Sequence, residues 1–145
     1  MTAMFPSLRS VVLDTTDART LAEFYRELLG YSYRPGDEPP RPEEPDLKGT
    51  DWLVLVARDG RGRLAFQQVN RFQQPTWPDG AVPQQLHLDL AVTSSEELAA
   101  QHQRILALGA RLLADRFDDP DEPLYVYADP SGHPFCVLVA AEARP

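Results

Sequence analysis

The same order of expected elements occurs in both halves of the chain, and this repeat is the feature that most limits its fold. Hydrophobic periodicity predicts a strand, a helix, a short strand and a hairpin in the first half. These elements cover residues 8–14, 17–30, 31–33 and 52–69. The second half repeats the order over residues 86–92, 94–109, 111–114 and 124–139. Each half is therefore expected to form one β-α-β-β-β module.

Helix-capping residues fix where the two expected helices begin and end. Asp17 is a suitable N-cap for the first helix, and Gly30 is a suitable stop. The second helix has a capping box formed by Ser94 and Glu97, and it stops at Gly109.

The repeat predicts an α+β fold made of two tandem β-α-β-β-β modules. One such module is a small open sheet with a helix on one face, so its other face needs a partner. We expect curved mixed sheets around a cavity, with the helices on the outside. The whole chain, 1–145, would be one domain with modules at about 7–70 and 84–141, joined by a Pro/Gln-rich linker at 71–83. The proline-rich loop at 35–50 is expected to be a lid over the cavity or disordered.

Composition and charge exclude several classes of function. The 145 residues carry a net charge of −8, which opposes binding to phosphate backbones, so no nucleic acid partner is expected. No segment approaches the ~20 apolar residues of a membrane span, and the N-terminal stretch has no signal-peptide run. A single cysteine excludes an internal disulfide and a CxxC pair. We expect a cytoplasmic protein with no membrane partner.

Strand periodicity indicates which side chains share the face that points into the cavity. His87, Asp89 and Ala91 alternate with the leucines of their strand, and Cys136 shares a face with Leu138. Asp89 is two residues beyond His87, which places it about 7 Å further along the strand. If the modules are equivalent, Ser10 corresponds to His87 and Gln67 to Cys136.

Three short motifs in this framework resemble the vicinal oxygen chelate superfamily, which includes glyoxalases, bleomycin resistance proteins and extradiol dioxygenases. The motifs are FYRELLG at 24–30, HLDLAV at 87–92 and DPSGHPF at 129–135. The glyoxalase-like branch is the most similar. The resemblance implies a cavity between paired modules and, in metal-dependent members, one divalent ion held by up to four side chains. Carried onto this chain, those positions are Ser10, Gln67, His87 and Cys136.

The residues at these four positions depart from the family's usual ligands. Mg²⁺, Mn²⁺ and Fe²⁺ prefer carboxylate oxygens with imidazole, and none of the four positions has a carboxylate. Zn²⁺ or Ni²⁺ suits His87 and Cys136 better, with Gln67 as a weaker ligand. A divalent metal (Zn, Ni, Mn or Fe) is therefore a possible cofactor rather than an expected one.

The aromatic residues have simpler structural roles as alternatives to ligand binding. Five of them are expected on the cavity face or in mobile segments: Trp52, Phe66, Trp77, Tyr125 and Phe135. Among them, Phe66 and Phe135 are expected to be packing residues. Trp77 is expected to cap the pocket or to pack in a dimer interface.

Two histidines and the cysteine are given no catalytic role. His133 is expected in a turn, exposed and with no partner that would make it a metal ligand, and His102 is expected on the surface. Cys136 is expected mainly to be a buried residue of a core strand, and a place in the pocket wall is the second interpretation.

Two functions from different classes remain open. The first is a binding protein that takes a small organic molecule in a cavity without a complete metal site, with contacts from seven residues. These are Ser10, Trp52, Gln67, Trp77, His87, Asp89 and Cys136. The second is a metal-dependent glyoxalase-like lyase or isomerase, or a ring-cleaving dioxygenase, with His87 as a metal ligand. In either case we expect a homodimer.

Overall fold

The computed structural model describes residues 4–77 and 79–140 and divides the chain into two compact units, Met1–Phe72 and Gln73–Pro145. We call them unit 1 and unit 2 and describe each by itself. Neither described helix has the length and apolarity needed to cross a membrane.

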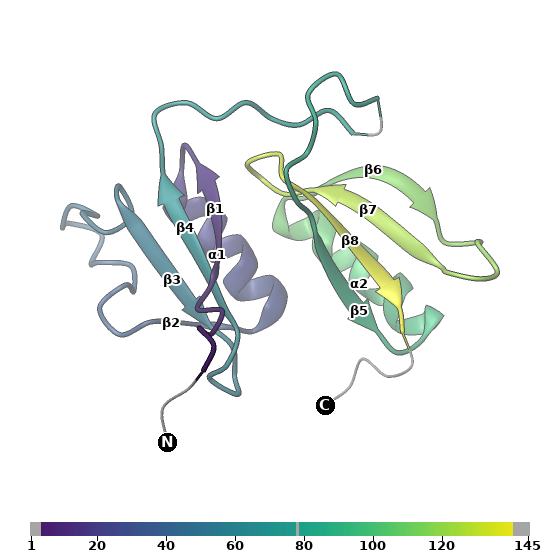
Figure 1. Cartoon of the computed structure of the whole chain (residues 1–145), viewed down its shortest axis with the longest axis horizontal. Coiled ribbons are helices and arrows are strands. Elements are labelled where there is room, and N and C mark those ends of the chain that lie inside the picture. The colour runs from purple at the N-terminus through teal and green to yellow at the C-terminus, as the bar shows by residue number, and fades with distance from the viewer. Residues whose placement is uncertain (1–3, 78, 141–145) are drawn as a thin grey trace. The chain divides into compact units, whose positions relative to one another are not determined.

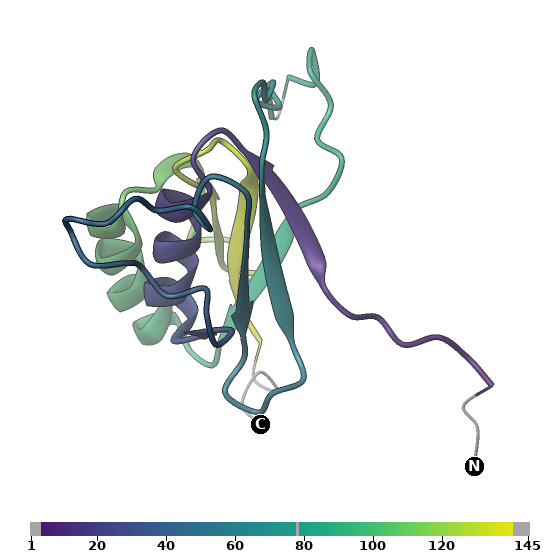
Figure 2. The same ribbon diagram turned by 90° about the vertical axis from the view of Figure 1, so that its left-hand side faces the viewer.

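Unit 1 is a four-stranded mixed sheet with one helix. Its elements are β1 (Val11–Thr15), α1 (Ala18–Leu29), β2 (Ser32–Tyr33), β3 (Trp52–Val56) and β4 (Arg63–Gln68). The strand order is β1-β4-β3-β2, with β1 parallel to β4 and the other pairs antiparallel. Helix α1 contacts β1, β3 and β4 on one face of the sheet, as the two ribbon views show (Figures 1 and 2).

Unit 2 repeats this arrangement. Its elements are β5 (Leu88–Val92), α2 (Ser95–Leu108), β6 (Arg111–Arg116), β7 (Leu124–Ala128) and β8 (Pro134–Val139). The strand order β5-β8-β7-β6 again has one parallel pair, β5 with β8. The predicted α+β fold of two tandem β-α-β-β-β modules is therefore confirmed. The first strand begins three residues later than expected, because Val11 is the first residue that pairs with β4.

The helix ends follow the predicted caps. The Asp17 carboxylate accepts the N–H of Thr20, and the Ser94 hydroxyl accepts the N–H of Glu97. Gly30 and Gly109 end the helices with φ of 69° and 114°, a left-handed conformation that favours glycine.

Each helix packs on aromatic side chains of its own sheet. Tyr25 stacks on Phe66 in unit 1, and Tyr127 stacks on Phe135 in unit 2. All four rings are fully buried. The prediction that Phe66 and Phe135 are packing residues is confirmed, and the opposite face of each sheet is left for other contacts.

The loop between β2 and β3 is tied to its own unit. The buried Asp37 carboxylate accepts the backbone N–H of Val54 at 2.9 Å, and Arg34 pairs with the same carboxylate. Arg19 of α1 donates two hydrogen bonds to Asp46, at 2.7 and 2.9 Å. Of the two alternatives for 35–50, disorder is therefore wrong, because the loop is fixed to α1 and β3. A role as a lid over a cavity stays a prediction.

The turn before β8 is organised by Asp129. Its buried carboxylate accepts the backbone N–H groups of Ser131 and His133, and Gly132 has a φ of 98°. His133 lies in this turn, as predicted, but it is half-buried, so the expectation of an exposed residue is wrong. Asp129 thus directs the chain into β8, where Cys136 lies.

Candidate functional site

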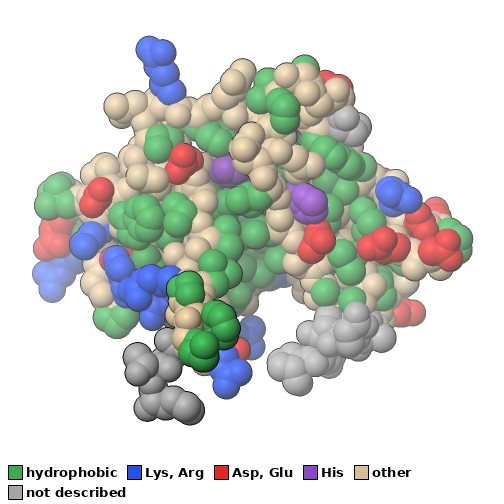
Figure 3. All heavy atoms as spheres, in the orientation of Figure 1, with side chains coloured by type: hydrophobic (Ala, Val, Ile, Leu, Met, Phe, Trp, Pro, Cys, Tyr) green, Lys and Arg blue, Asp and Glu red, His purple; other side chains and the backbone are tan. Residues whose placement is uncertain are grey.

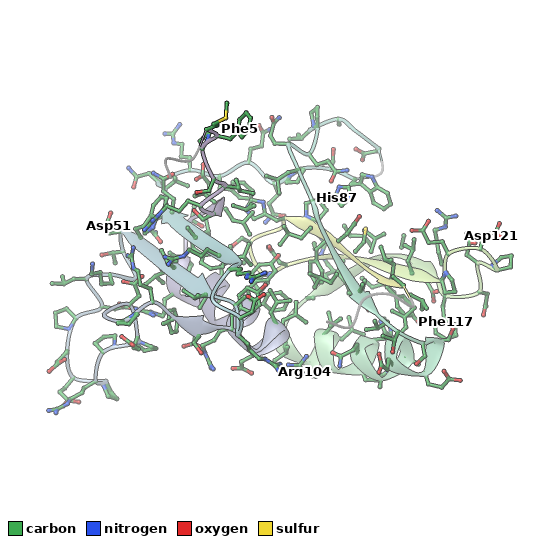
Figure 4. The ribbon with its side chains drawn as sticks, turned by 60° about the horizontal axis from the view of Figure 1, so that its bottom comes forward. Phe5, Asp51, His87, Arg104, Phe117 and Asp121 are labelled. Atoms are coloured by element: carbon green, nitrogen blue, oxygen red, sulfur yellow. The ribbon has the colours of Figure 1, made fainter. Side chains whose placement is uncertain are left out.

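The polar side chains of interest in unit 2 lie on the face of its sheet opposite α2, which we call the open face. Strand register places Asp89 of β5 directly beside Cys136 of β8. His87 precedes β5 by one residue and shares the side of Asp89 because side chains alternate along a strand. Figure 4 labels His87 on the segment that leads into β5.

The three side chains converge into one cluster. His87 Nε2 and Asp89 Oδ1 are 3.2 Å apart, and one donor atom from each of His87, Asp89 and Cys136 lies within 4.8 Å of the others. The His87 and Asp89 side chains are 43% and 58% exposed, so the cluster is open to a molecule from solution.

The position of Asp89 corrects the sequence-based hypothesis. The spacing of about 7 Å along the strand applies to the backbone, whereas the side chains of His87 and Asp89 bend toward each other. A carboxylate therefore joins the imidazole and the thiol, although none of the four positions expected from the family has one.

Cys136 is a neutral thiol in this environment. Burial and the neighbouring Asp89 carboxylate raise its pKa to about 11. Both causes disfavour the thiolate: burial removes its hydration, and the carboxylate repels its charge. At neutral pH the thiol is thus a weak hydrogen-bond donor beside Asp89 rather than a nucleophile.

A small cavity of about 80 Å³ lies beside this cluster. Its walls are Trp77, Gln84, His87, Val126, Pro134 and Cys136. A cavity of this size has room for a few waters or for one functional group of a larger molecule.

Gln84 supplies an acceptor in this cavity that sequence analysis missed. Its Oε1 is buried and has no hydrogen-bond partner among the described residues. A buried acceptor without a partner is unfavourable, so a donor on a bound molecule or water would stabilise this wall. The residue lies in an aperiodic segment, where the sequence gives no signal for it.

Most of the segment expected as a linker between modules, 71–83, belongs to unit 2 and packs on its open face through residues 74–77. Thr76 closes it into a compact loop, since its backbone N–H donates to the Val82 carbonyl and its hydroxyl accepts the Val82 N–H. The Gln74 side chain lies against Gly132, where an added Cβ would meet its Cδ at 2.5 Å. We call residues 73–77 and 79–84 the connector.

The connector holds Trp77 at the walls of two cavities on unit 2. One is the small cavity beside His87 and Cys136, and the other is a larger cavity next to it. On the side of the molecule drawn in Figure 3, histidine and acidic side chains lie among hydrophobic ones. The half-buried Trp77 thus forms part of the pocket wall. A dimer contact at Trp77 stays a prediction.

In unit 1 the expected residues lie on the face opposite α1. Gln67 and Trp52 are cross-strand neighbours, and the helix face of the same strands is formed by Phe66 and Leu53. Ser10 directly precedes β1. The assembly of Ser10 and Gln67 with His87 and Cys136 into one site stays a prediction.

The expected equivalence of Gln67 and Cys136 is wrong by two residues. Counted from the helix caps, Val12 of β1 corresponds to Asp89 of β5. Val12 pairs with Ala65, whereas Asp89 pairs with Cys136. Ala65 is therefore the counterpart of Cys136. The hairpin loops differ in length by one residue, so counting from the turns misplaces the register.

Two further expectations are wrong because both residues lie on the helix side of the sheet. His102 is half-buried, stacks on Tyr125 with ring centroids 4.0 Å apart, and its Nδ1 is 2.7 Å from the Tyr127 hydroxyl. Tyr125 is buried in this stack and does not face the cavity. His102 is thus the hydrogen-bond partner of a buried tyrosine rather than a surface residue.

A family model described as a glyoxalase-like domain matches residues 10–138. The chain belongs to this glyoxalase-like family. The resemblance to the vicinal oxygen chelate superfamily is therefore confirmed. A search of curated proteins finds no match.

Solved structures with the glyoxalase-like fold match at low sequence identity. A possible glyoxalase from Bacillus cereus has a TM-score of 0.62 and 18% identity, covering 94% of this chain and 99% of that one. A glyoxalase/bleomycin resistance protein/dioxygenase family enzyme from Burkholderia phytofirmans has a TM-score of 0.64 and 15% identity. The match covers 90% of this chain and 95% of that one. The fosfomycin resistance protein FosX from Listeria monocytogenes, in complex with Mn(II) and sulfate, has a TM-score of 0.64 and 14% identity. The match covers 94% of each chain.

The donor set of this glyoxalase-like chain fits some divalent metals better than others. Imidazole, carboxylate and thiolate together are the ligands of zinc sites, and three protein ligands with an open position are typical of catalytic zinc. The same set fits Mn²⁺ poorly, because Mn²⁺ prefers oxygen ligands. His87, Asp89 and Cys136 therefore suit Zn²⁺ or Ni²⁺.

Proposed function

We propose that the chain is a small-molecule-binding protein of the glyoxalase-like family that takes its ligand on the open face of unit 2. The observation that carries this proposal is the convergence of His87, Asp89 and Cys136 at an otherwise mostly apolar cavity. A few convergent polar groups in an apolar pocket are the usual composition of a ligand site. Ser10, Gln67 and Trp52 of unit 1 remain further proposed contacts.

Each polar group of the cavity has a defined role in this proposal. The unpaired Gln84 Oε1 accepts a hydrogen bond from a hydroxyl or amine of the ligand. The His87–Asp89 pair orients the imidazole, so that its position toward the ligand is fixed. Trp77 and Val126 cover the apolar part of the same molecule.

A thermal-shift screen of small aromatic alcohols, amines and carboxylates tests this function, with each hit retested on variants. Hits should lose most of their shift in His87→Ala and Gln84→Leu. The matched control is Gln85→Leu, which changes an exposed neighbour outside the cavity lining. Hits that stabilise all three variants as well as the parent protein would refute this location.

A second candidate function is a metal-dependent glyoxalase-like lyase or isomerase, or a ring-cleaving dioxygenase. It is favoured by the three donor atoms within 4.8 Å, one more strong ligand than the sequence indicated. A bound Zn²⁺ or Ni²⁺ would act as a Lewis acid on an oxygen of the substrate. Metal binding must then displace the Cys136 proton, so it should release a proton and strengthen as pH rises.

Elemental analysis of protein purified without chelator or affinity tag separates the two functions. The metal-dependent function predicts about one equivalent of metal in the parent, loss in His87→Ala and Asp89→Asn, and retention in Asp51→Asn. Asp51 is an exposed acid in unit 1 and serves as the control (Figure 4). If the parent holds no metal after incubation with Zn²⁺ or Ni²⁺, the metal-free binding function stands.

A further inference from the structure

A second, larger cavity lies next to the first on unit 2. Its volume is about 270 Å³, and Trp77 and Pro134 line both cavities. Together the two cavities reach the lower part of the ~300–1,000 Å³ range of small-molecule sites. A molecule bound at the first cavity therefore has room for a second functional group beyond the shared wall of Trp77 and Pro134.

Arg111 gives the larger cavity its chemical character. It begins β6 and lies in one cross-strand row with Ala128 and Pro134, so its side chain belongs to the open face. Among the described residues no acid pairs with it, whereas Arg116 at the other end of β6 is paired with Asp119. A guanidinium at a cavity wall is suited to hold a carboxylate or phosphate through parallel hydrogen bonds.

The larger cavity is also lined by one acid, Asp79, whose carboxylate makes hydrogen bonds within the connector. The Asp79 carboxylate accepts the Ala81 N–H at 3.0 Å, and the Thr76 hydroxyl also hydrogen-bonds to it. Asp79 thus holds the loop that carries Trp77, and Arg111 remains the cation available to a ligand.

We infer that the larger cavity binds the anionic end of the ligand, with Arg111 contacting a carboxylate or phosphate-type group and Trp77 covering the adjoining apolar part. This inference rests on the proposed function in one respect: the molecule whose anionic end contacts Arg111 would be the same ligand that contacts His87. The ligand is then a small organic acid, even though the protein's net charge of −8 opposes anions at long range.

Benzoate, benzamide and benzamidine test the inference because they share one shape and differ in charge. Each probe is titrated at low ionic strength while the indole N–H signals of Trp77 and Trp52 are followed by NMR. Trp52→Phe assigns the two signals. We expect the Trp77 signal to move, with benzoate binding about fivefold more tightly than benzamide, the difference between a charge-assisted and a neutral hydrogen bond. Benzamidine should bind most weakly.

The variants locate the preference for an anion. Arg111→Gln should make benzoate and benzamide bind equally. The control Arg104→Gln removes the same charge from the exposed side of α2 and should leave the preference unchanged (Figure 4). A Trp77 signal that does not respond, a preference for benzamide or benzamidine, or a benzoate preference that survives in Arg111→Gln would each overturn the inference.

The His87→Ala variant keeps this test apart from that of the proposed function. If His87→Ala weakens the hits of the thermal-shift screen but Arg111→Gln leaves the benzoate preference intact, the inference fails and the proposed function stands. If Arg111→Gln removes the preference while those hits bind His87→Ala as well as the parent, the inference stands and the proposed function fails.

Discussion

Cys136 is expected to react with the aromatic disulfide DTNB at pH 8 about 20-fold more slowly than an unstructured cysteine peptide. It is the one cysteine of the chain, so the reaction reports on this site alone. The reacting species is the thiolate, and the structure places the thiol where burial and the Asp89 carboxylate oppose its ionisation.

Two opposing factors set the size of this effect. With a pKa of about 11, roughly 0.001 of the Cys136 thiol is ionised at pH 8, against roughly 0.24 for an ordinary thiol of pKa about 8.5. This difference slows the reaction about 240-fold. The more basic thiolate is, however, about 13-fold more nucleophilic, for a Brønsted coefficient of about 0.45. The ratio of the two factors is about 20.

The pH dependence separates this electrostatic effect from restricted access to the thiol. DTNB absorbance is followed from neutral pH upward on the folded protein, and the rate should keep rising toward about pH 11. Asp89→Asn should react faster and reach its plateau at lower pH, because the repelling charge is gone. Asp118→Asn, an exposed acid in the loop after β6, is the control. A plateau near about pH 9, the ordinary range of a thiol, would refute the reasoning.

Three stability predictions follow from contacts within single units, each checked by urea unfolding. Asp37→Ala should lower the free energy of unfolding by about 1–3 kcal/mol, because the buried Val54 N–H loses its acceptor. His102→Ala should cost more than Tyr127→Phe, since only the first leaves a buried hydroxyl without its partner, and a double-mutant cycle should show coupling above about 0.5 kcal/mol. Gly132→Ala should cost about 1–3 kcal/mol through its φ of 98° and its clash with the Gln74 side chain, and shortening Gln74 should restore only part of this.

Most of the fold could be predicted because it depends on local chemistry. Asp17 and Ser94 fix the helix starts through one side-chain hydrogen bond each, and alternation along a strand assigns Asp89 and Cys136 to the same face. These signals need no knowledge of distant residues. The order of elements was therefore correct, while the first strand of each module starts two or three residues later than expected.

The site could be predicted only in part, because its geometry depends on side-chain directions and on register between strands. The backbone spacing of His87 and Asp89 says nothing of how their side chains bend toward each other. The residue of unit 1 that corresponds to Cys136 depends on the length of a hairpin loop. The burial of His102 depends on which strand lies under the helix. Gln84 belongs to a connector without periodicity, so only its packed position reveals its acceptor.

The two modules share one architecture but not one chemistry. The register counterparts of His87, Asp89 and Cys136 in unit 1 are Ser10, Val12 and Ala65, counted from the helix caps and the parallel strand pairs. Only Ser10 among these three has a polar side chain, and it is a poor metal ligand. Among the described residues, the three donor side chains that converge therefore belong to unit 2, and their counterparts in unit 1 form no such set. If unit 1 contacts the ligand as proposed, it would do so through apolar contact and hydrogen bonds, for which Trp52 and Gln67 on its face opposite α1 are suited.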